Sequence, residues 1–267
     1  MGIDYEAIRF WDAYSVAEDI RLDIEENPEK ESFEKYFMPS RAEIKAILKA
    51  PLRWTLLHQF IKDRYLERRI WGFEHHRKDM LDLVAVEYQT ILEGYGINHG
   101  FPKINIDASD FNNYEENEMQ ELVNQLRELI PIEQIAHETF QLLFSNRKFL
   151  KKFNQLVAGY IRYLKKSEYP DILKRDGVLY RKTLPGWAKR GIFYRDKGRC
   201  IQCSRDLTGV IVTGEEVHYD HIVPLAVGGT NDPGNFQLLC RRCNLSKGVN
   251  TFTSEIYPTY WSLHLEK

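Results

Sequence analysis

Two pairs of cysteines, each spaced as C-x-x-C, constrain the fold of this chain more than any other feature. Cys200 and Cys203 form the first pair, and Cys240 and Cys243 form the second. A C-x-x-C turn holds two thiolates at the right separation for tetrahedral zinc, and two such turns complete a four-sulfur site. Because the 36 residues between the pairs exceed the ~15–20 of a plain zinc ribbon, we expect further structure within this segment.

Two disulfides, or one redox-active pair, are the alternatives to zinc. The first residues, MGIDYEAIRFWD, carry acids where a secretory signal needs basic residues and an apolar run. No segment approaches the ~18 uninterrupted apolar residues of a membrane span. We therefore expect a cytoplasmic protein with no membrane partner, whose thiols stay reduced. A redox pair also needs a thioredoxin-like βαβ setting, which this sequence lacks. The prediction is a structural Zn²⁺ with four sulfur ligands and no open position for a substrate.

The charge of the chain is unevenly distributed. The 267 residues have a net charge of −2, but residues 174–250 hold 13 Lys and Arg against 7 Asp and Glu. Residues 1–173 have a net charge of −7. All four cysteines lie in the basic part. Because local charge decides how a polyanion interacts with a protein, the basic part is the expected contact for nucleic acid.

Hydrophobic periodicity separates the chain into a helical part and a mixed part. Helices are predicted over residues 40–94, 118–130 and 145–166, with a loop at 101–117. The helical pattern lapses near residues 169–182. We predict an α+β protein: a mostly α-helical domain at residues 1–175, a small zinc-bound module at 176–250 and a C-terminal tail at 251–267.

The mixed part shows signals of both strand and helix. Residues 185–198 predict a short basic helix that ends at Gly198. Residues 208–214 and 215–222 are predicted as the two strands of a β-hairpin, and a final helix is expected to start near Cys240. The module is therefore predicted as a β-hairpin followed by a helix, with the cysteines distributed along it.

Three polar residues, two between the cysteine pairs and one directly after Cys243, suit phosphodiester hydrolysis. Asp220 and Asn244 offer hard oxygen ligands for Mg²⁺ or Mn²⁺, an ion that keeps other positions open for water and phosphate oxygens. His221, with an ordinary pKa near 6.5, suits a general base. Neighbours on a strand face opposite sides, so Asp220 and His221 share a site only if the strand ends, as Pro224 indicates. A cap or turn role is the alternative for Asp220 and Asn244.

The run HYDHIVPL at residues 218–225, followed by GGTNDPGNFQLLC and by Asn244 just after Cys243, closely resembles the HNH endonucleases of the ββα-metal class. The resemblance covers about residues 185–250. It implies a zinc-stapled nuclease domain in which His221 activates water, while Asp220 and Asn244 hold the catalytic cation. Asn235 matches the family's central Asn, which ties down the loop and supports the catalytic His. Asn244 replaces the His of many members, and Asn is a familiar alternative there. The family also implies 5′-phosphate products.

Five basic residues of the module are expected to contact DNA phosphates as a group: Lys247, Arg241, Arg242, Arg195 and Arg199. A solvated basic face is the alternative for each of them taken singly. His218 shares a strand face with Asp220 and could touch the metal or a phosphate, and it is left unassigned.

The expected function is a metal-dependent DNA endonuclease that nicks one strand per centre or cuts both strands through two modules. The architecture resembles effectors of bacterial anti-phage and restriction systems, in which the helical domain would mediate homodimerisation, partner docking or regulation. Two alternatives remain open. One is an HNH nuclease acting on RNA or structured nucleic acid, and the other is a non-catalytic zinc module that only binds nucleic acid or protein.

Overall fold

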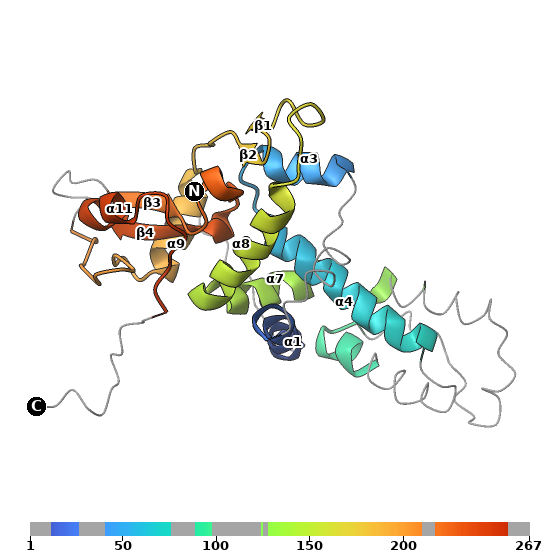
Figure 1. Ribbon diagram of the computed structural model, residues 1–267. Helices are drawn as coiled ribbons and strands as arrows, with labels where there is room; N and C mark the ends of the chain where they lie inside the picture. The colour runs from blue at the N-terminus through green and yellow to red at the C-terminus, as the bar shows by residue number, and fades with distance from the viewer. Residues whose placement is uncertain are drawn as a thin grey trace, which may run out of the picture. The chain divides into compact units, whose positions relative to one another are not determined.

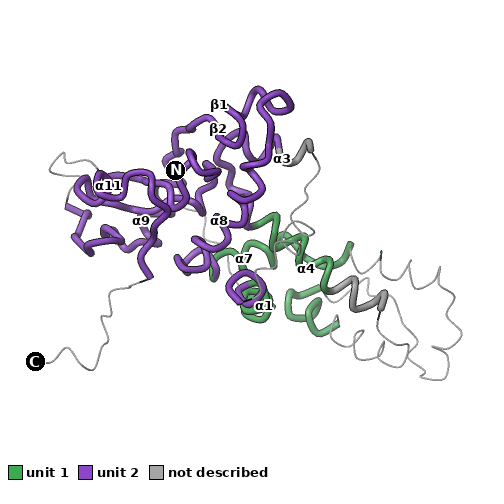
Figure 2. The backbone as a smooth tube through the Cα atoms, in the orientation of Figure 1, with its two compact units in different colours: residues 1–20, 58–142 green, residues 21–57, 143–267 purple. Residues whose placement is uncertain are grey.

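The computed structural model describes residues 12–26, 41–75, 89–97, 124, 128–209 and 217–255. The loop predicted at 101–117 lies outside the described residues, as do most of the helix predicted at 118–130 and most of the strand predicted at 208–214. The described chain divides into two compact units (Figure 2). Unit 1 contains residues 1–20 and 58–142, and unit 2 contains residues 21–57 and 143–267.

Unit 1 is built from helices. It contains most of α1 (Ala13–Glu25), α4 (Leu56–His75) and α7 (Ile132–Phe144), together with a short helical segment at residues 89–94 (Figure 1). Phe60, Ile61 and Ile135 are at most 2% exposed and belong to its core. The Tyr95 hydroxyl donates to the buried Glu138 at 2.9 Å, which gives two polar groups of this unit a partner.

Unit 2 contains two further helices that precede its strands. α3 spans Arg41–Lys49, and α8 spans Arg147–Ile161. The Asn146 side chain caps α8 by accepting from the Phe149 amide at 3.0 Å, which satisfies one of the free donors of the first turn. Buried residues at three- and four-residue spacing form one face of α8: Phe149, Leu150, Phe153, Val157 and Ile161. The helix predicted over 145–166 is thus confirmed within a few residues.

A small hairpin follows α8. β1 (Leu173–Arg175) pairs in antiparallel fashion with β2 (Val178–Leu179) through an Asp176-Gly177 turn. Next comes α9 (Gly186–Arg195), which confirms the predicted basic helix. The chain leaves α9 through Lys197 at φ 55° and Gly198 at φ 62°. A Cβ at Gly198 would lie 2.7 Å from a Thr208 methyl carbon, so this turn needs glycine for both conformation and space.

The cysteine-bearing module completes unit 2. β3 (Val217–His221) pairs in antiparallel fashion with β4 (Phe236–Cys240), and Asp220 is opposite Gln237. Two short 3-10 turns, η3 (Leu225–Val227) and η4 (Pro233–Asn235), connect the two strands. The helix α11 (Arg241–Lys247) begins directly after Cys240, as expected.

Among the described residues, β3 pairs with β4, a strand that the hydrophobic pattern did not reveal. Most of the partner strand expected at residues 208–214 lies outside the described residues, so that pairing stays a prediction. All five residues of β4 are buried, so the strand lacks the alternation of a half-exposed strand. The α+β fold class is confirmed, with the HNH-like residues in its C-terminal part. Among the described helices, none is both long enough and apolar enough to cross a membrane.

Candidate active site

The four cysteine thiols come together beside the end of β4. All four Sγ atoms lie within 4.8 Å of one another, and those of Cys203 and Cys240 are 3.8 Å apart. In the first turn, the Ser204 amide donates to the Cys200 carbonyl at 2.8 Å, and Ser204 has a φ of 59°. Cys243 is on the first turn of α11, three residues after Cys240. The two turns therefore direct four sulfurs to one point.

The surroundings of the thiols indicate what they can hold. Cys200 is fully buried in an apolar cluster with Leu207 and Leu238. Burial raises the pKa of the Cys243 thiol, and hydrogen bonds with the other three cysteines raise it further. Thiols this close together resist joint ionisation, whereas a divalent cation favours the thiolate at each of them. Four sulfurs in a closed cluster are the donor set that structural zinc prefers, so the residues fit the metal that the sequence predicts.

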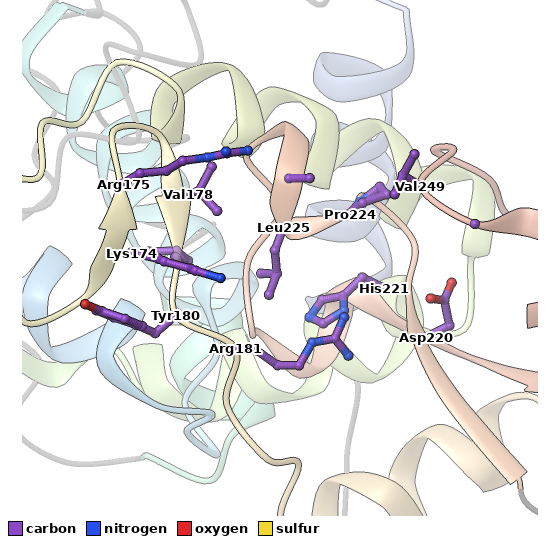
Figure 3. A pocket seen from close by; sticks show the side chains of 13 residues that line it. Lys174, Arg175, Val178, Tyr180, Arg181, Asp220, His221, Pro224, Leu225 and Val249 are labelled. Carbon is purple, nitrogen blue, oxygen red and sulfur yellow. The ribbon is translucent and has the colours of Figure 1, made fainter.

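The end of β3 places Asp220 and His221 at one cavity (Figure 3). These neighbours would face opposite sides of a regular strand, but β3 ends at His221, and the chain then turns into η3 through Pro224. Both residues line a cavity of about 500 Å³. The strand end near Pro224, expected from the sequence, is confirmed, and it brings a carboxylate and an imidazole to the same space.

His221 has the properties of a neutral base held in a fixed position. It is 2% exposed, and its ring centroid is 4.1 Å from that of Phe236. Burial lowers the pKa of His221 to about 3, the positive charge of Arg181 lowers it further, and a hydrogen bond with Asn231 acts in the opposite direction. The imidazole is therefore neutral at neutral pH. Its Nε2 atom is buried and has no hydrogen-bond partner among the described residues, which is uncommon for a buried nitrogen.

Asn235 ties the segment after His221 to η4. Its Nδ2 donates to the carbonyls of Val223 and Thr230 at 2.9 Å, and its Oδ1 accepts from the Val223 amide at 2.9 Å. Its own carbonyl accepts from the Ile222 amide at 2.7 Å. Asn235 is fully buried, so these bonds form away from water and fix the chain immediately after His221.

Asp220 forms a salt bridge with a buried lysine. The Lys247 ammonium lies 2.8 Å from Asp220 Oδ2 and donates to the His221 carbonyl at 2.8 Å. Gln237 also donates to Asp220 Oδ2, at 3.4 Å. Among the described residues, no donor contacts the other carboxylate oxygen, Oδ1. One oxygen of Asp220 is therefore used for positioning, and the other is available to a cation.

Asn244 lies beside His218. Its Nδ2 is 3.4 Å from His218 Nδ1, and Asn244 is half-buried on α11. His218 and Asp220 alternate along β3 and so share a face of the strand. Asn244 is not among the residues that line the cavity of Asp220 and His221. Its amide Oδ1 is not used in the contact with His218, so it can serve as an oxygen ligand.

The five basic residues expected to contact phosphates differ in their positions. Arg241 and Arg242 are exposed on α11. The half-buried Arg199 donates to the Ser204 carbonyl at 3.0 Å and lies 3.6 Å from Asp206. Arg195 is instead buried: its side chain is 2% exposed, binds both oxygens of Asp196 and donates to the Phe236 carbonyl. Lys247 is 5% exposed beneath Asp220. In this structure Arg195 and Lys247 therefore stabilise the interior of the module.

Three other basic residues line the cavity and were not singled out from the sequence. Lys174 and Arg175 come from β1, and Arg181 comes from the segment that follows β2. All three are exposed, and Arg181 lies beside His221 (Figure 3). The Asp176-Gly177 pair between short apolar runs is a hairpin signal that could have located this wall.

Comparison with known proteins adds one finding. Residues 200–250 match the family model described as HNH endonuclease. Comparison with curated proteins and with solved structures finds no match for the chain. The matched segment contains all four cysteines, together with Asp220, His221, Asn235 and Asn244, whereas the hairpin β1–β2 precedes it.

Proposed function

We propose that this protein is a metal-dependent endonuclease that hydrolyses DNA phosphodiester bonds, because residues 200–250 match the HNH endonuclease family model and contain a cluster of four cysteines that fits zinc. One observation carries this proposal. A buried, neutral His221, whose Nε2 has no hydrogen-bond partner in the described part of the chain, meets the carboxylate of Asp220 at a cavity lined by basic residues. A base, an oxygen ligand and a positively charged wall are the groups that phosphodiester hydrolysis requires.

In the proposed reaction His221 removes a proton from the attacking water. The oxygen of that water forms the new bond to phosphorus, and the bond from phosphorus to the 3′ oxygen of the preceding nucleotide breaks. The leaving 3′ oxygen takes a proton from solvent water, so the products are a 5′-phosphate and a 3′-hydroxyl. A base must keep its orientation during proton transfer. The ring of Phe236 and the hydrogen bonds of Asn235 hold His221 and the chain that follows it.

Asp220 and Asn244 would hold a Mg²⁺ or Mn²⁺ ion. Each has a side-chain oxygen that the described contacts leave available, and hard oxygen ligands suit these ions. When bound, the cation supplies positive charge for the phosphate and for the leaving oxygen. The four cysteines would hold a structural Zn²⁺ that stabilises the module.

DNA is the proposed substrate because the module is basic. Residues 174–250 have a net charge of +6, and residues 1–173 have −7. The acidic part suits homodimerisation, docking of a protein partner or regulation better than it suits DNA binding. We place the activity in the cytoplasm and, from the architecture, in bacterial defence against phage. A single centre cuts one strand, so a monomer would nick and two modules would be needed for a double-strand cut.

Cleavage of supercoiled plasmid tests this function. Purified protein is incubated with no added divalent ion, with Mg²⁺ and with Mn²⁺, and the conversion to nicked and linear plasmid is measured. Prolonged EDTA is avoided because it would also remove zinc. We expect metal-dependent cleavage that His221→Ala abolishes. His137→Ala, a histidine change in unit 1, serves as the matched control and should cleave like the wild type.

Three results would contradict the proposal: cleavage without added metal, cleavage unaffected by His221→Ala, or binding of plasmid with no cleavage under any metal. The last result would identify a zinc-dependent binding module. A parallel incubation with single-stranded DNA and with transfer RNA shows whether RNA is the better substrate, in which case the assignment to DNA would be wrong.

A further inference from the structure

The cavity beside His221 has a wall that lies outside the HNH match. The hairpin β1–β2 and the segment that follows it contribute the basic side chains of Lys174, Arg175 and Arg181, whereas the match begins at residue 200. These side chains reach the same space as Asp220 and His221 (Figure 3). One side of the cavity therefore carries the carboxylate of Asp220 and the imidazole of His221, and the other side carries three basic side chains.

The positive charge of this wall is not neutralised within the described residues. None of its three basic side chains forms a salt bridge with a described carboxylate. The acid of the hairpin turn, Asp176, is directed elsewhere. It accepts from the Lys166 amide at 2.9 Å and from the Lys165 ammonium at 3.1 Å, and these contacts lower the pKa of Asp176. The wall therefore offers uncompensated cations to a ligand in the cavity.

The hairpin is anchored to the end of α8. The Gly177 amide donates to the Leu164 carbonyl at 3.0 Å, and Gly177 has a φ of 65°. A Cβ at this position would lie 2.9 Å from the Arg162 carbonyl oxygen, so only glycine allows the turn to approach so closely. The position of Lys174 and Arg175 is thus set by the residues that directly follow α8.

The opposite side of the cavity is anchored to the same helix end. The Arg162 side chain donates to the Val227 carbonyl, at the end of η3, at 2.9 Å. The next residue, Gly228, has a φ of 93°, and a Cβ there would lie 2.6 Å from the Ala158 carbonyl oxygen. The hairpin and the η3 turn therefore share one support, which fixes the width of the cavity before any ligand binds.

Arg181 is held in place by Asn231. The Asn231 Nδ2 donates to the Tyr180 carbonyl at 2.8 Å, and its Oδ1 accepts from the Lys182 amide at 3.0 Å. These bonds lie on both sides of Arg181 and fix its backbone, while its side chain stays exposed. Asn231 itself is 3% exposed, so water competes little for the two bonds.

We propose that Lys174, Arg175 and Arg181 form a binding site for the backbone phosphates of DNA beside the scissile bond, with Asn231 as the positioning residue of Arg181. Guanidinium and ammonium groups on a fixed wall are the usual partners of phosphate oxygens. This inference rests on the proposed nuclease function. The proposed substrate site extends beyond residues 200–250, the segment that matches the family. DNA would lie between the end of β3, which is inside the match, and the hairpin β1–β2, which is outside it.

The salt dependence of DNA binding tests the three basic residues. Full-length protein with no added divalent ion is titrated into a fluorescein-labelled DNA duplex at several KCl concentrations, and anisotropy gives the dissociation constant. Each lost phosphate contact reduces the slope of log K against log salt by about 0.9. We expect a reduction of about 1 for Arg181→Ala and about 2 for Lys174→Ala combined with Arg175→Ala.

Arg190→Ala is the matched control, because Arg190 is exposed on α9 but does not line the cavity. Its slope should stay close to that of the wild type. If the wall variants behave like Arg190→Ala, or if the wild type binds no DNA, the proposed site is refuted. Stronger binding of an RNA duplex, with the same loss in the wall variants, would overturn the assignment to DNA.

A double-mutant cycle tests the role of Asn231. If Asn231 acts by positioning Arg181, Asn231→Ala weakens DNA binding in the wild-type background and has no further effect when Arg181 is already Ala. A purely structural role would lower the melting temperature and weaken binding equally in both backgrounds. Additive losses would therefore contradict the positioning role.

Failure of this site and failure of the nuclease function can be told apart. Suppose that the wild type binds DNA but never cleaves it, and that the wall variants show a smaller slope of log K against log salt. This result would support the phosphate site and contradict the nuclease function. Cleavage that depends on His221, combined with unchanged binding and cleavage in the wall variants, would contradict the phosphate site alone.

Discussion

The ammonium of Lys247 lies 2.8 Å from Oδ2 of Asp220, in a side chain that is 1% exposed. The same ammonium donates to the His221 carbonyl at 2.8 Å, so one buried cation contacts two consecutive residues of the candidate active site. Lys247 comes from the last turn of α11, which carries Asn244 and Cys243. The contact therefore joins the end of β3 to the helix that holds one of the proposed zinc ligands.

Lys247→Met tests whether this lysine supports the site or binds phosphate. Removing the ammonium leaves Asp220 without its charged partner, and we expect the free energy of unfolding to fall by about 1–3 kcal/mol. The slope of DNA binding against salt should stay unchanged, because a buried ammonium cannot reach DNA. Urea unfolding and anisotropy measure the two effects. A slope reduced by about 1 with unchanged stability would show that Lys247 contacts a phosphate.

Asn235→Asp is expected to disrupt the site despite its small size. The substitution replaces the Nδ2 donor with a carboxylate oxygen that would face the carbonyls of Val223 and Thr230. The Val223 amide would still donate to one carboxylate oxygen, but the other oxygen would be buried without a donor, which should cost about 3 kcal/mol or more. We expect a lower melting temperature and loss of plasmid cleavage. Asn250→Asp, the same change at an exposed position, is the control. Equal behaviour of the two variants would contradict the proposed role of Asn235.

Much of this site could be predicted from local sequence. The C-x-x-C spacing identified the four cysteines, and Pro224 indicated the strand end that brings Asp220 and His221 to one cavity. The partner strand β4 could not be predicted, because a strand buried on both faces shows no alternation. Strand pairing across a long connection depends on packing that a local window does not contain.

The positions of the basic residues were the hardest part to predict. In the sequence, Lys247 and Arg195 look like surface cations. In the structure, Lys247 is buried against Asp220 and the side chain of Arg195 is buried against Asp196, and neither arrangement can be seen from local sequence. Conversely, Arg181 lines the cavity, and the backbone on both sides of it is bonded to Asn231, 50 residues later in the chain. The domain boundary predicted at residue 175 stays a prediction. A hydrogen bond crosses it, because the Asn154 amide of α8 donates to the Gly234 carbonyl of η4.

Asp232 should make stability depend on pH. Its Oδ2 accepts from the amide of Leu56, the first residue of α4, at 2.7 Å, and its Oδ1 accepts from the Gly234 amide at 2.7 Å. Burial raises the pKa of Asp232 from 3.8 to about 6, against the effect of these two bonds. The folded state therefore binds a proton more tightly than the unfolded state does. This contribution to stability is fully present below pH 3.8 and is lost as the pH rises to about 6.

Asp232→Asn isolates this effect. The difference in unfolding free energy, wild type minus variant, should decrease by up to about 3 kcal/mol between pH 4 and pH 7 and stay level above pH 7. Urea unfolding at several pH values measures it. Taking the difference cancels any loss of zinc at low pH, because both proteins keep the four cysteines. A difference that is constant with pH, or that increases, would show that the Asp232 pKa is not raised.

Cys200→Ser tests whether the proposed zinc site stabilises the module locally. Serine offers a weaker ligand for zinc than a thiolate does, and the cysteine cluster also forms the apolar core around Leu207 and Leu238. We expect zinc content to fall below one ion per chain. Hydrogen exchange should become fast over residues 185–250, and the described helices of unit 1 should stay protected. α8 should exchange faster than in the wild type, because its Asn154 loses the Gly234 carbonyl when η4 unfolds.

Ser246→Ala provides the comparison, because Ser246 is exposed on α11 and contributes no thiol. It should retain full zinc content and wild-type exchange. If Cys200→Ser exposes unit 1 as completely as residues 185–250, the two units unfold as one, and the zinc would stabilise the whole protein. If instead the variant keeps one zinc per chain and wild-type protection, the remaining three thiols suffice, and the four-sulfur site would be wrong.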